Sequence, residues 1–355
     1  MAPPYRISPS QVARYYFLEC ERYLRYTSTP VADRPGEGIP ALAADERPAT
    51  RAILDGGYEW EERVVSSLGD SAHVAVAPER HLRERILTVE ETERAIRAVN
   101  PGEYIYQASL DSPARLYEQF GLDRSFVTFS VCRPDLIECV EVEGRRVLRI
   151  IDVKATPGLK LSHRVQTTLY CLILEALLEE WGLDITVDHQ AGVWLSEAKG
   201  PELFDTRTMR PPIEAFLAED LVPILRERPG DARWHVYFRC EWCEYFEPCR
   251  AQMQAEDSVS RLPYLGVHSR RFLGQLDPPA NTLTELAEAL SEPARATQLE
   301  QSAMLRGRTH RIREQVRALR EGAVRVLGGA SIGMPRRENC RVVFTLQTEP
   351  VNGQL

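Results

Sequence analysis

The chain has 355 residues, with 44 lysines and arginines against 52 aspartates and glutamates, and a formal net charge of −8. A chain of this length can bury a sizeable core and predicts two or three domains, so it does not need cysteine cross-links for stability. The negative balance argues against a generally cationic nucleic-acid-binding coat, although it is compatible with a local basic groove.

No charged and then apolar leader opens the sequence. The longest apolar run, LYCLILEALLEEWGL, is interrupted by Glu175 and is too short to span a bilayer. We therefore expect a cytoplasmic protein with no membrane partner. Thiols stay reduced in the cytosol, so clustered cysteines indicate metal ligands rather than disulfides.

The first half of the chain predicts helices and then a hairpin. A helix begins after an N-cap at Ser8 and leads to Cys20 at its end, residues 31–48 are rich in Pro and Gly and predict a loop, and residues 50–68 return to helical spacing. Residues 126–155 alternate β-branched side chains around a turn at 143–145, which predicts a β-hairpin.

The second half is predicted to be mostly helical. The spacing predicts a helix at 163–182, a strand at 190–196 and a helix at 211–228. A cysteine cluster follows, and the helical segment at 297–322 is rich in arginine. The arginine-rich helix near 306–325 could follow a phosphate backbone, or it could be a solvated helix face balanced by glutamates.

The chemistry is expected in the hairpin. Asp135 lies near the start of one strand and Asp152 near the end of the next, so antiparallel pairing brings both carboxylates to one end of the sheet. Lys154 shares a face with Asp152 because side chains alternate along a strand. Carboxylate oxygens suit Mg²⁺ or Mn²⁺, and a cation beside a lysine predicts hydrolysis of a phosphodiester. As a bare pattern this pair is a weak signal, because acidic residues at strand ends are usually solvated charges.

Three further residues are candidates for the same site. Glu61, on the helix at 50–68, could supply another carboxylate, or it could be an exposed charge on an amphipathic helix. Gln166 and Tyr170 are four residues apart on the following helix and so share one face. Their plainer interpretation is ordinary helix-surface polarity with Tyr170 half buried.

Cys240, Cys243 and Cys249 lie within ten residues, in the segment FRCEWCEYFEPCR. Three thiols are one short of a closed four-ligand site. Four thiolates can bind zinc or an iron–sulfur cluster, and the spacing does not distinguish the two.

These motifs, taken in order, resemble those of the RecB-family nucleases of the PD-(D/E)XK superfamily. The residues that carry the resemblance are GYEWE at 57–61, RPDLIE at 133–138, IDVKAT at 151–156 and QTTLY at 166–170. The resemblance implies an α/β fold with a PD-(D/E)XK restriction-endonuclease-like core, a mixed sheet flanked by helices. It also implies metal ligation by Asp135, Asp152 and Glu61, and a catalytic site completed by Lys154, Gln166 and Tyr170. Several relatives carry histidine where this chain has Glu61.

One cysteine before the nuclease core and three after it resemble the iron–sulfur subset of that family, which includes CRISPR-associated exonucleases and AddAB-type nucleases. The resemblance implies a [4Fe–4S] cluster on Cys20, Cys240, Cys243 and Cys249, which would clip the N-terminal helix to the end of the core. The other cysteines have apolar neighbours and are expected to be small core residues; they are Cys132, Cys139, Cys171 and Cys340.

The expected organisation is a nuclease domain with its cluster at 1–258, a helical region at 259–335 and, at 336–355, the first strand of a truncated RNase H-like domain. Thr345 and Gln347 stand where relatives of that strand carry acidic residues. The expected activity is a Mg²⁺- or Mn²⁺-dependent exonuclease acting on single-stranded DNA or free DNA ends, in DNA processing, repair or phage defence. The alternative is a DNA-end-binding or scaffold module of a helicase or defence complex with an unused nuclease site.

Overall fold

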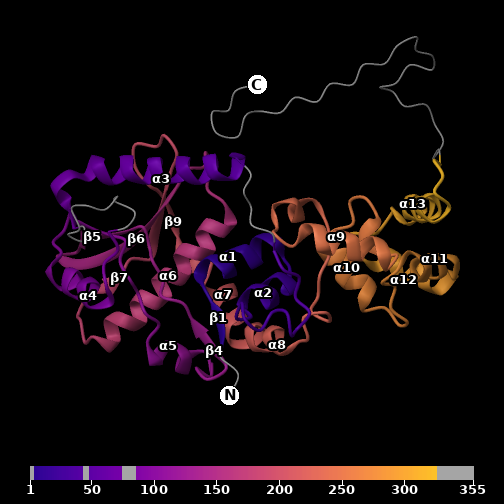
Figure 1. Cartoon of the computed structure of the whole chain (residues 1–355), viewed down its shortest axis with the longest axis horizontal. Coiled ribbons are helices and arrows are strands. Elements are labelled where there is room, and N and C mark those ends of the chain that lie inside the picture. The colour runs from indigo at the N-terminus through magenta and orange to yellow at the C-terminus, as the bar shows by residue number, and fades with distance from the viewer. Residues whose placement is uncertain (1–3, 43–47, 74–84, 326–355) are drawn as a thin grey trace, which may run out of the picture. The chain divides into compact units, whose positions relative to one another are not determined.

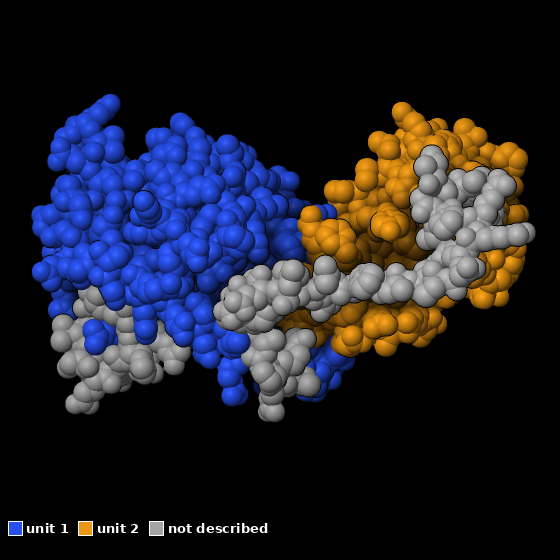
Figure 2. Space-filling view, turned by 90° about the horizontal axis from the view of Figure 1, so that it is seen from above, with its two compact units in different colours: residues 1–232, 349–354 blue, residues 233–348, 355 orange. Residues whose placement is uncertain are grey.

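The computed structural model of the chain describes residues 4–42, 48–73 and 85–325. They form two compact units, of which unit 1 extends to Ala232 and unit 2 begins at Arg233. Figure 1 traces the helices and strands, and Figure 2 colours the two units.

Unit 1 is built around a mixed sheet. Within the described residues this sheet has seven strands in the order β2-β3-β5-β6-β8-β9, with β7 beside β6. β3 pairs antiparallel with β5, and β5 pairs antiparallel with β6. β6 and β8 are parallel, and β9 is antiparallel to β8. The strand bounds are β2 Ala72–His73, β3 Tyr104–Tyr106, β5 Leu136–Val142, β6 Arg145–Lys154, β7 Thr186–Val187, β8 Gln190–Leu195 and β9 Glu202–Asp205. A separate parallel pair joins β1 (Tyr5–Ile7) to β4 (Val127–Phe129).

The β5–β6 hairpin confirms the predicted strand pair and its turn over residues 136–154, whereas β4, in the first part of the predicted hairpin, pairs with β1 instead. Glu143 (φ 53°) and Gly144 (φ 77°) both adopt left-handed backbone conformations, as two-residue hairpin turns require. The register pairs Leu136 with Ile151, which places Asp135 opposite Asp152 at the far end from the turn.

Two long helices cover the opposite faces of this sheet. On one face α3 (Pro48–Leu68) packs Trp60 against a cluster that includes Leu136 and Ile151. On the other, α6 (Leu161–Glu180) packs against the cluster that includes Ile137 and Ile150. Both helices were predicted from their spacing, and Figure 1 shows the sheet flanked by helices, which confirms the expected mixed α/β layering.

The N-terminal helices pack beyond α6. Ser8 caps α1 (Pro9–Leu18) through a capping box with Gln11, as the sequence predicted. α1 ends at Leu18, its C-cap Glu19 has a φ of 48°, and α2 (Glu21–Ser28) begins two residues after Glu19. Cys20 therefore lies directly after the end of α1, as the sequence predicted, and is the N-cap of α2.

The remaining helices of unit 1 are shorter. They are α4 (Val89–Ala98), α5 (Ala114–Gln119), α7 (Arg210–Ala215) and α8 (Leu221–Arg226). The predicted helix at 211–228 is present but contains a π-helical stretch over Phe216–Asp220. Pro223 lies just beyond it, and a proline inside a helix removes one donor and displaces the preceding backbone carbonyls, which favours a local change of winding.

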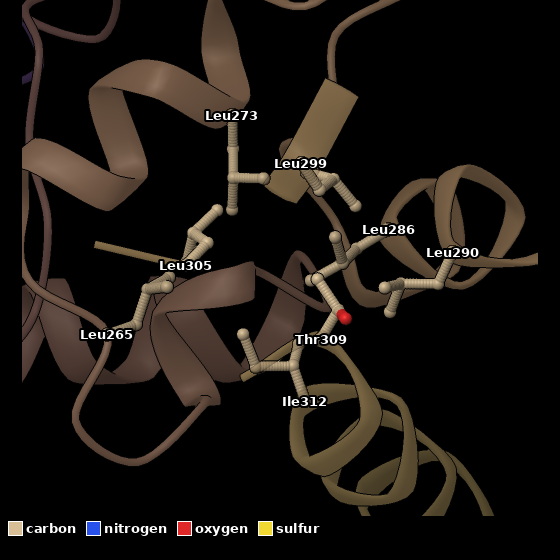
Figure 3. A pocket seen from close by; sticks show the side chains of 8 residues that line it. All are labelled: Leu265, Leu273, Leu286, Leu290, Leu299, Leu305, Thr309 and Ile312. Carbon is tan, nitrogen blue, oxygen red and sulfur yellow. The ribbon is translucent and has the colours of Figure 1, made fainter. Parts of the chain in front are cut away.

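Unit 2 is helical, as expected. After a short 3₁₀ helix at Phe238–Trp242 it contains α9 (Phe246–Ala255), α10 (Val267–Gly274), α11 (Leu283–Ser291), α12 (Pro293–Gln301) and α13 (Thr309–Glu321). Leucines of α10 to α12 form its core together with Ile312 and Val316 of α13. Figure 3 shows eight side chains around a small void in this core, six leucines with Thr309 and Ile312. The void measures ≈ 10 Å³, at the lower limit for a single water, and therefore marks a closed core rather than a binding site.

The predicted loop, the core cysteines and the predicted C-terminal strand can each be located in the chain. The described part of the predicted loop at 31–48 is irregular up to residue 42. Cys132, Cys139 and Cys171 are buried, as predicted for core residues. Cys340 and the predicted strand at 336–355 lie outside the described residues. None of the described helices combines the length and the apolar character that crossing a bilayer requires.

Candidate functional site

The hairpin brings Asp135, Asp152 and Lys154 together. Lys154 Nζ lies 2.8 Å from Asp152 Oδ2 and 3.6 Å from Asp135 Oδ2. Asp152 is 1% exposed, and its oxygens accept no hydrogen bond of good geometry within the described residues, so the lysine is the charge that balances it. Burial alone would lower the pKa of Lys154, but the Asp152 and Asp135 carboxylates raise it above its usual value, and the ammonium stays charged.

Asp135 is held in place by the backbone of the opposite strand. The Val153 N–H donates to Asp135 Oδ2 at 2.7 Å. Burial raises the pKa of Asp135 to about 7, which Lys154 opposes and the Asp152 carboxylate reinforces. Two neighbouring carboxyl groups both ionise at a low free-energy cost only when a cation offsets their repulsion, and a divalent metal provides that positive charge.

Glu61 reaches this end of the sheet from α3. Its Oε1 accepts hydrogen bonds from the Tyr106 hydroxyl at 2.8 Å and from Gln107 Nε2 at 2.7 Å. Burial raises the pKa of Glu61, and the negative charge of Asp135 raises it further. Glu61 is therefore a half-buried, hydrogen-bonded carboxyl near Asp135, and not a freely solvated charge on the helix surface.

Gln107 is a site residue that the sequence analysis did not single out. Its amide donates to Glu61 at 2.7 Å and to Asp135 Oδ1 at 3.4 Å, so one side chain spans both carboxyls. Its backbone N–H also donates to the Asp135 carbonyl at 3.0 Å, and its φ is 48°. The one available signal was a polar residue directly after the short apolar strand β3, which is too weak to select a residue.

Gln166 and Tyr170 project from α6 on the side of the sheet that carries Asp152. Gln166 Nε2 donates to the Tyr170 hydroxyl at 2.9 Å, and Tyr170 is 5% exposed. Burial, and then the Asp152 carboxylate, raise the pKa of Tyr170, so its hydroxyl stays protonated. One turn earlier on α6, burial and the nearby charge of Lys154 lower the pKa of His163 to about 4.

The carboxylates at this end of the sheet are the candidate ligands for a divalent cation. Within the described residues no three or more His, Cys, Asp or Glu side chains are gathered closely enough to hold a metal ion. Mg²⁺ does not require that many protein ligands, because it keeps several waters and binds through one or two carboxylates together with a substrate phosphate. Asp135 and Asp152 fit this requirement. The buried Asp152 oxygens lie beside Lys154 Nζ and, among the residues that the structure describes, accept no hydrogen bond of good geometry, which fits a role as ligands.

Three of the four cysteines named for a cluster lie in the first helical segments of unit 2, and within the described residues they do not form a group gathered closely enough to hold a metal. Cys240 is in the 3₁₀ helix, its carbonyl accepts from the Cys243 N–H at 2.8 Å, and Cys249 lies in α9. Burial raises the pKa of Cys243 to about 12, and the neighbouring Cys240 and Cys249 sulfurs add to this effect. Metal binding would reverse it, because a coordinating thiol is deprotonated. Cys20 belongs to unit 1.

The sequence comparison decides the family. Residues 39–250, more than half of the chain, match the family described as the PD-(D/E)XK nuclease superfamily. The chain belongs to the PD-(D/E)XK nuclease superfamily. Its members are typically metal-dependent nucleases that generally use Mg²⁺ or Mn²⁺, and the match spans Glu61, Asp135, Asp152 and Lys154. A comparison with curated protein sequences finds no match.

Proposed function

We propose that this protein is a Mg²⁺- or Mn²⁺-dependent deoxyribonuclease that hydrolyses phosphodiester bonds at the ends of single-stranded DNA. The observation that carries the proposal is the position of Lys154 Nζ, 2.8 Å from Asp152 and 3.6 Å from Asp135. Two carboxylates and an ammonium at one point are the groups that metal-assisted phosphodiester hydrolysis uses. Membership of a nuclease superfamily supports the same class of reaction.

Each residue has a proposed role in this reaction. Asp135 and Asp152 hold the cation, with Glu61 as a further carboxylate beside Asp135. When bound, the cation activates the attacking water and offsets the charge that develops on the scissile phosphate. The Lys154 ammonium donates hydrogen bonds to that water or to a phosphate oxygen. The protonated Tyr170 hydroxyl, steadied by the amide of Gln166, orients the strand.

The test is cleavage of end-labelled single-stranded DNA by the wild-type protein and by Asp152→Ala, with Mg²⁺, with Mn²⁺ and with EDTA. We expect cleavage only by the wild type and only with metal. The matched control is Glu141→Ala, which removes an exposed carboxylate from the same hairpin and should leave activity unchanged. Equal cleavage by Asp152→Ala would refute the assigned site. DNA binding without cleavage by the wild type would favour a scaffold module instead.

We also propose a [4Fe–4S] cluster on Cys20, Cys240, Cys243 and Cys249. Its support is the resemblance to the iron–sulfur subset and the close sequence spacing of Cys240, Cys243 and Cys249, and four thiolates are a standard ligand set for such clusters. With this cluster the proposed nuclease domain extends to residue 258. The resemblance also suggests a helicase or a defence-system protein as a partner.

Metal analysis of anaerobically purified protein tests the cluster. We expect iron and sulfide, lost in Cys20→Ala together with increased protease sensitivity, since metal binding and local folding are coupled. Cys132→Ala, which changes a buried thiol outside the set, is the control and should keep its iron. Stoichiometric zinc would overturn the iron assignment, and full iron in Cys20→Ala would overturn the ligand set.

A further inference from the structure

A hollow of ≈ 480 Å³ lies between α11 and α13 of unit 2, and it is distinct from the core void of Figure 3, with which it shares only Leu290. Its size is within the range of ligand-binding sites. The lining combines apolar and cationic side chains; it consists of Ala287, Leu290, Ser291, Arg313, Val316, Arg317 and Arg320. We call this hollow the α11–α13 groove.

The three arginines of the groove form one row. Arg313, Arg317 and Arg320 are spaced by four and then three residues on α13, so they project from the same face of the helix. At 1.5 Å per residue the row is about 10 Å long. This length corresponds to about three nucleotide steps of 3.4 Å along one strand of a duplex.

The charge of the groove is cancelled only in part by its own helix. Of the two glutamates of α13, Glu314 pairs with the groove's Arg317 at 2.9 Å, and Glu321 pairs with Arg325, outside the groove, at 2.5 Å. Arg313 donates one hydrogen bond to the Leu290 carbonyl at 2.7 Å and keeps its other donors, since a guanidinium has five N–H groups. Within the described part of the chain Arg320 makes no ion pair. The groove therefore carries excess positive charge in a chain whose net charge is −8.

We propose that the α11–α13 groove binds the sugar–phosphate backbone of a nucleic acid strand. A row of arginines fits an anion with repeated charges better than one with a single charge, because each guanidinium can contact a separate phosphate. The apolar floor of Ala287, Leu290 and Val316 accepts sugar or base faces without reading sequence. The inference rests on the proposed nuclease function and adds a second contact for the same substrate, in a unit that lies largely outside the matched family region.

The experiment measures binding of a fluorescent single-stranded oligonucleotide to the full chain in EDTA, over a series of salt concentrations. Each phosphate contact contributes about 0.7 to the salt slope of a single strand. Changing the three groove arginines to glutamine should therefore reduce the slope by about 2 and weaken binding at least tenfold. The double variant Arg317→Gln/Arg320→Gln keeps the Arg313 bond to α11, so it tests the groove even if the triple variant unfolds.

The matched control changes three exposed arginines of unit 2 outside the groove, Arg271, Arg306 and Arg311, and alters the net charge equally. It should keep most of the slope. An equal loss in control and groove variants, or no loss in either, would overturn the proposal. Competition by a mononucleotide or by inorganic phosphate should be at least 100-fold weaker than by the oligonucleotide, and equal competition would point to a free-phosphate site instead.

Cleavage by the same variants separates this inference from the proposed function. The groove variants should still cleave at saturating DNA, because their carboxylate site is intact. Cleavage together with unchanged binding would refute the groove alone. If the wild type neither binds nor cleaves DNA, the proposed function itself fails.

Discussion

Replacing Lys154 with methionine should destabilise the metal-free protein more than the metal-bound protein. The ammonium lies 2.8 Å from Asp152 and 3.6 Å from Asp135, and Asp152 is 1% exposed. Removing one partner of a buried ion pair costs about 3–5 kcal/mol. The Lys154 side chain is 28% exposed, so water compensates part of the loss and the lower figure, about 3 kcal/mol, applies.

A loss of about 3 kcal/mol corresponds to a fall in Tm of about 6–12 °C for a unit of this size. Without the competing ammonium, the carboxylate pair of Lys154→Met should bind Mg²⁺ more tightly than that of the wild type, so Mg²⁺ should stabilise the variant more. At 100 times the variant's Kd, Mg²⁺ adds about 2.7 kcal/mol, which restores most of the lost stability. Thermal unfolding in EDTA and in Mg²⁺ gives both numbers. Lys199→Met, which removes an exposed lysine of the same unit, is the control and should melt like the wild type. An equal Mg²⁺-induced shift in the wild type and in Lys154→Met would refute the reasoning.

Three further predictions concern single side chains. Gln107→Leu removes the amide between Glu61 and Asp135, so we expect roughly tenfold lower activity and a higher Mg²⁺ requirement in a metal titration. An unchanged Mg²⁺ requirement would contradict a positioning role for Gln107. Tyr170→Phe should raise KM for DNA without rescue by excess metal, and full rescue at unchanged DNA affinity would show that the hydroxyl acts through the metal. Burial lowers the pKa of His235 from 6.5 to about 4, so below pH 6.5 the unfolded chain binds a proton that the folded unit does not. The free energy of unfolding should therefore fall by roughly 3 kcal/mol by pH 4. Urea unfolding of His235→Gln should show a smaller fall.

The hairpin and its charged groups could be predicted from the sequence because every step was local. Alternation fixed which residues share a face, and the turn at Glu143 and Gly144 fixed the register, so the positions of Asp135, Asp152 and Lys154 followed. The catalytic roles of these residues remain predictions.

Other parts of the site depend on long-range packing and could not be predicted in this way. The approach of Glu61 to Asp135 requires α3 to cross the sheet at one particular place, which periodicity does not give. Gln107 acts through a left-handed backbone conformation after a three-residue strand, and nothing in the local sequence requires that conformation. Non-glycine residues adopt such angles in only a few per cent of cases, so the residue type of Gln107 does not predict its conformation.

The locality of the β5–β6 hairpin also sets an order of assembly for the site. A hairpin closed by a two-residue turn forms in microseconds, whereas contacts between distant segments form later because their loop-closure entropy must first be overcome. During synthesis Asp135, Asp152 and Lys154 can thus meet before α6 has been made and can cover them. Glu61 has already been synthesised by then, but its helix can dock only when β3 and β5 offer a surface. We therefore expect the nascent chain to acquire its charged cluster first and its buried, competent site only after residue 180 has emerged.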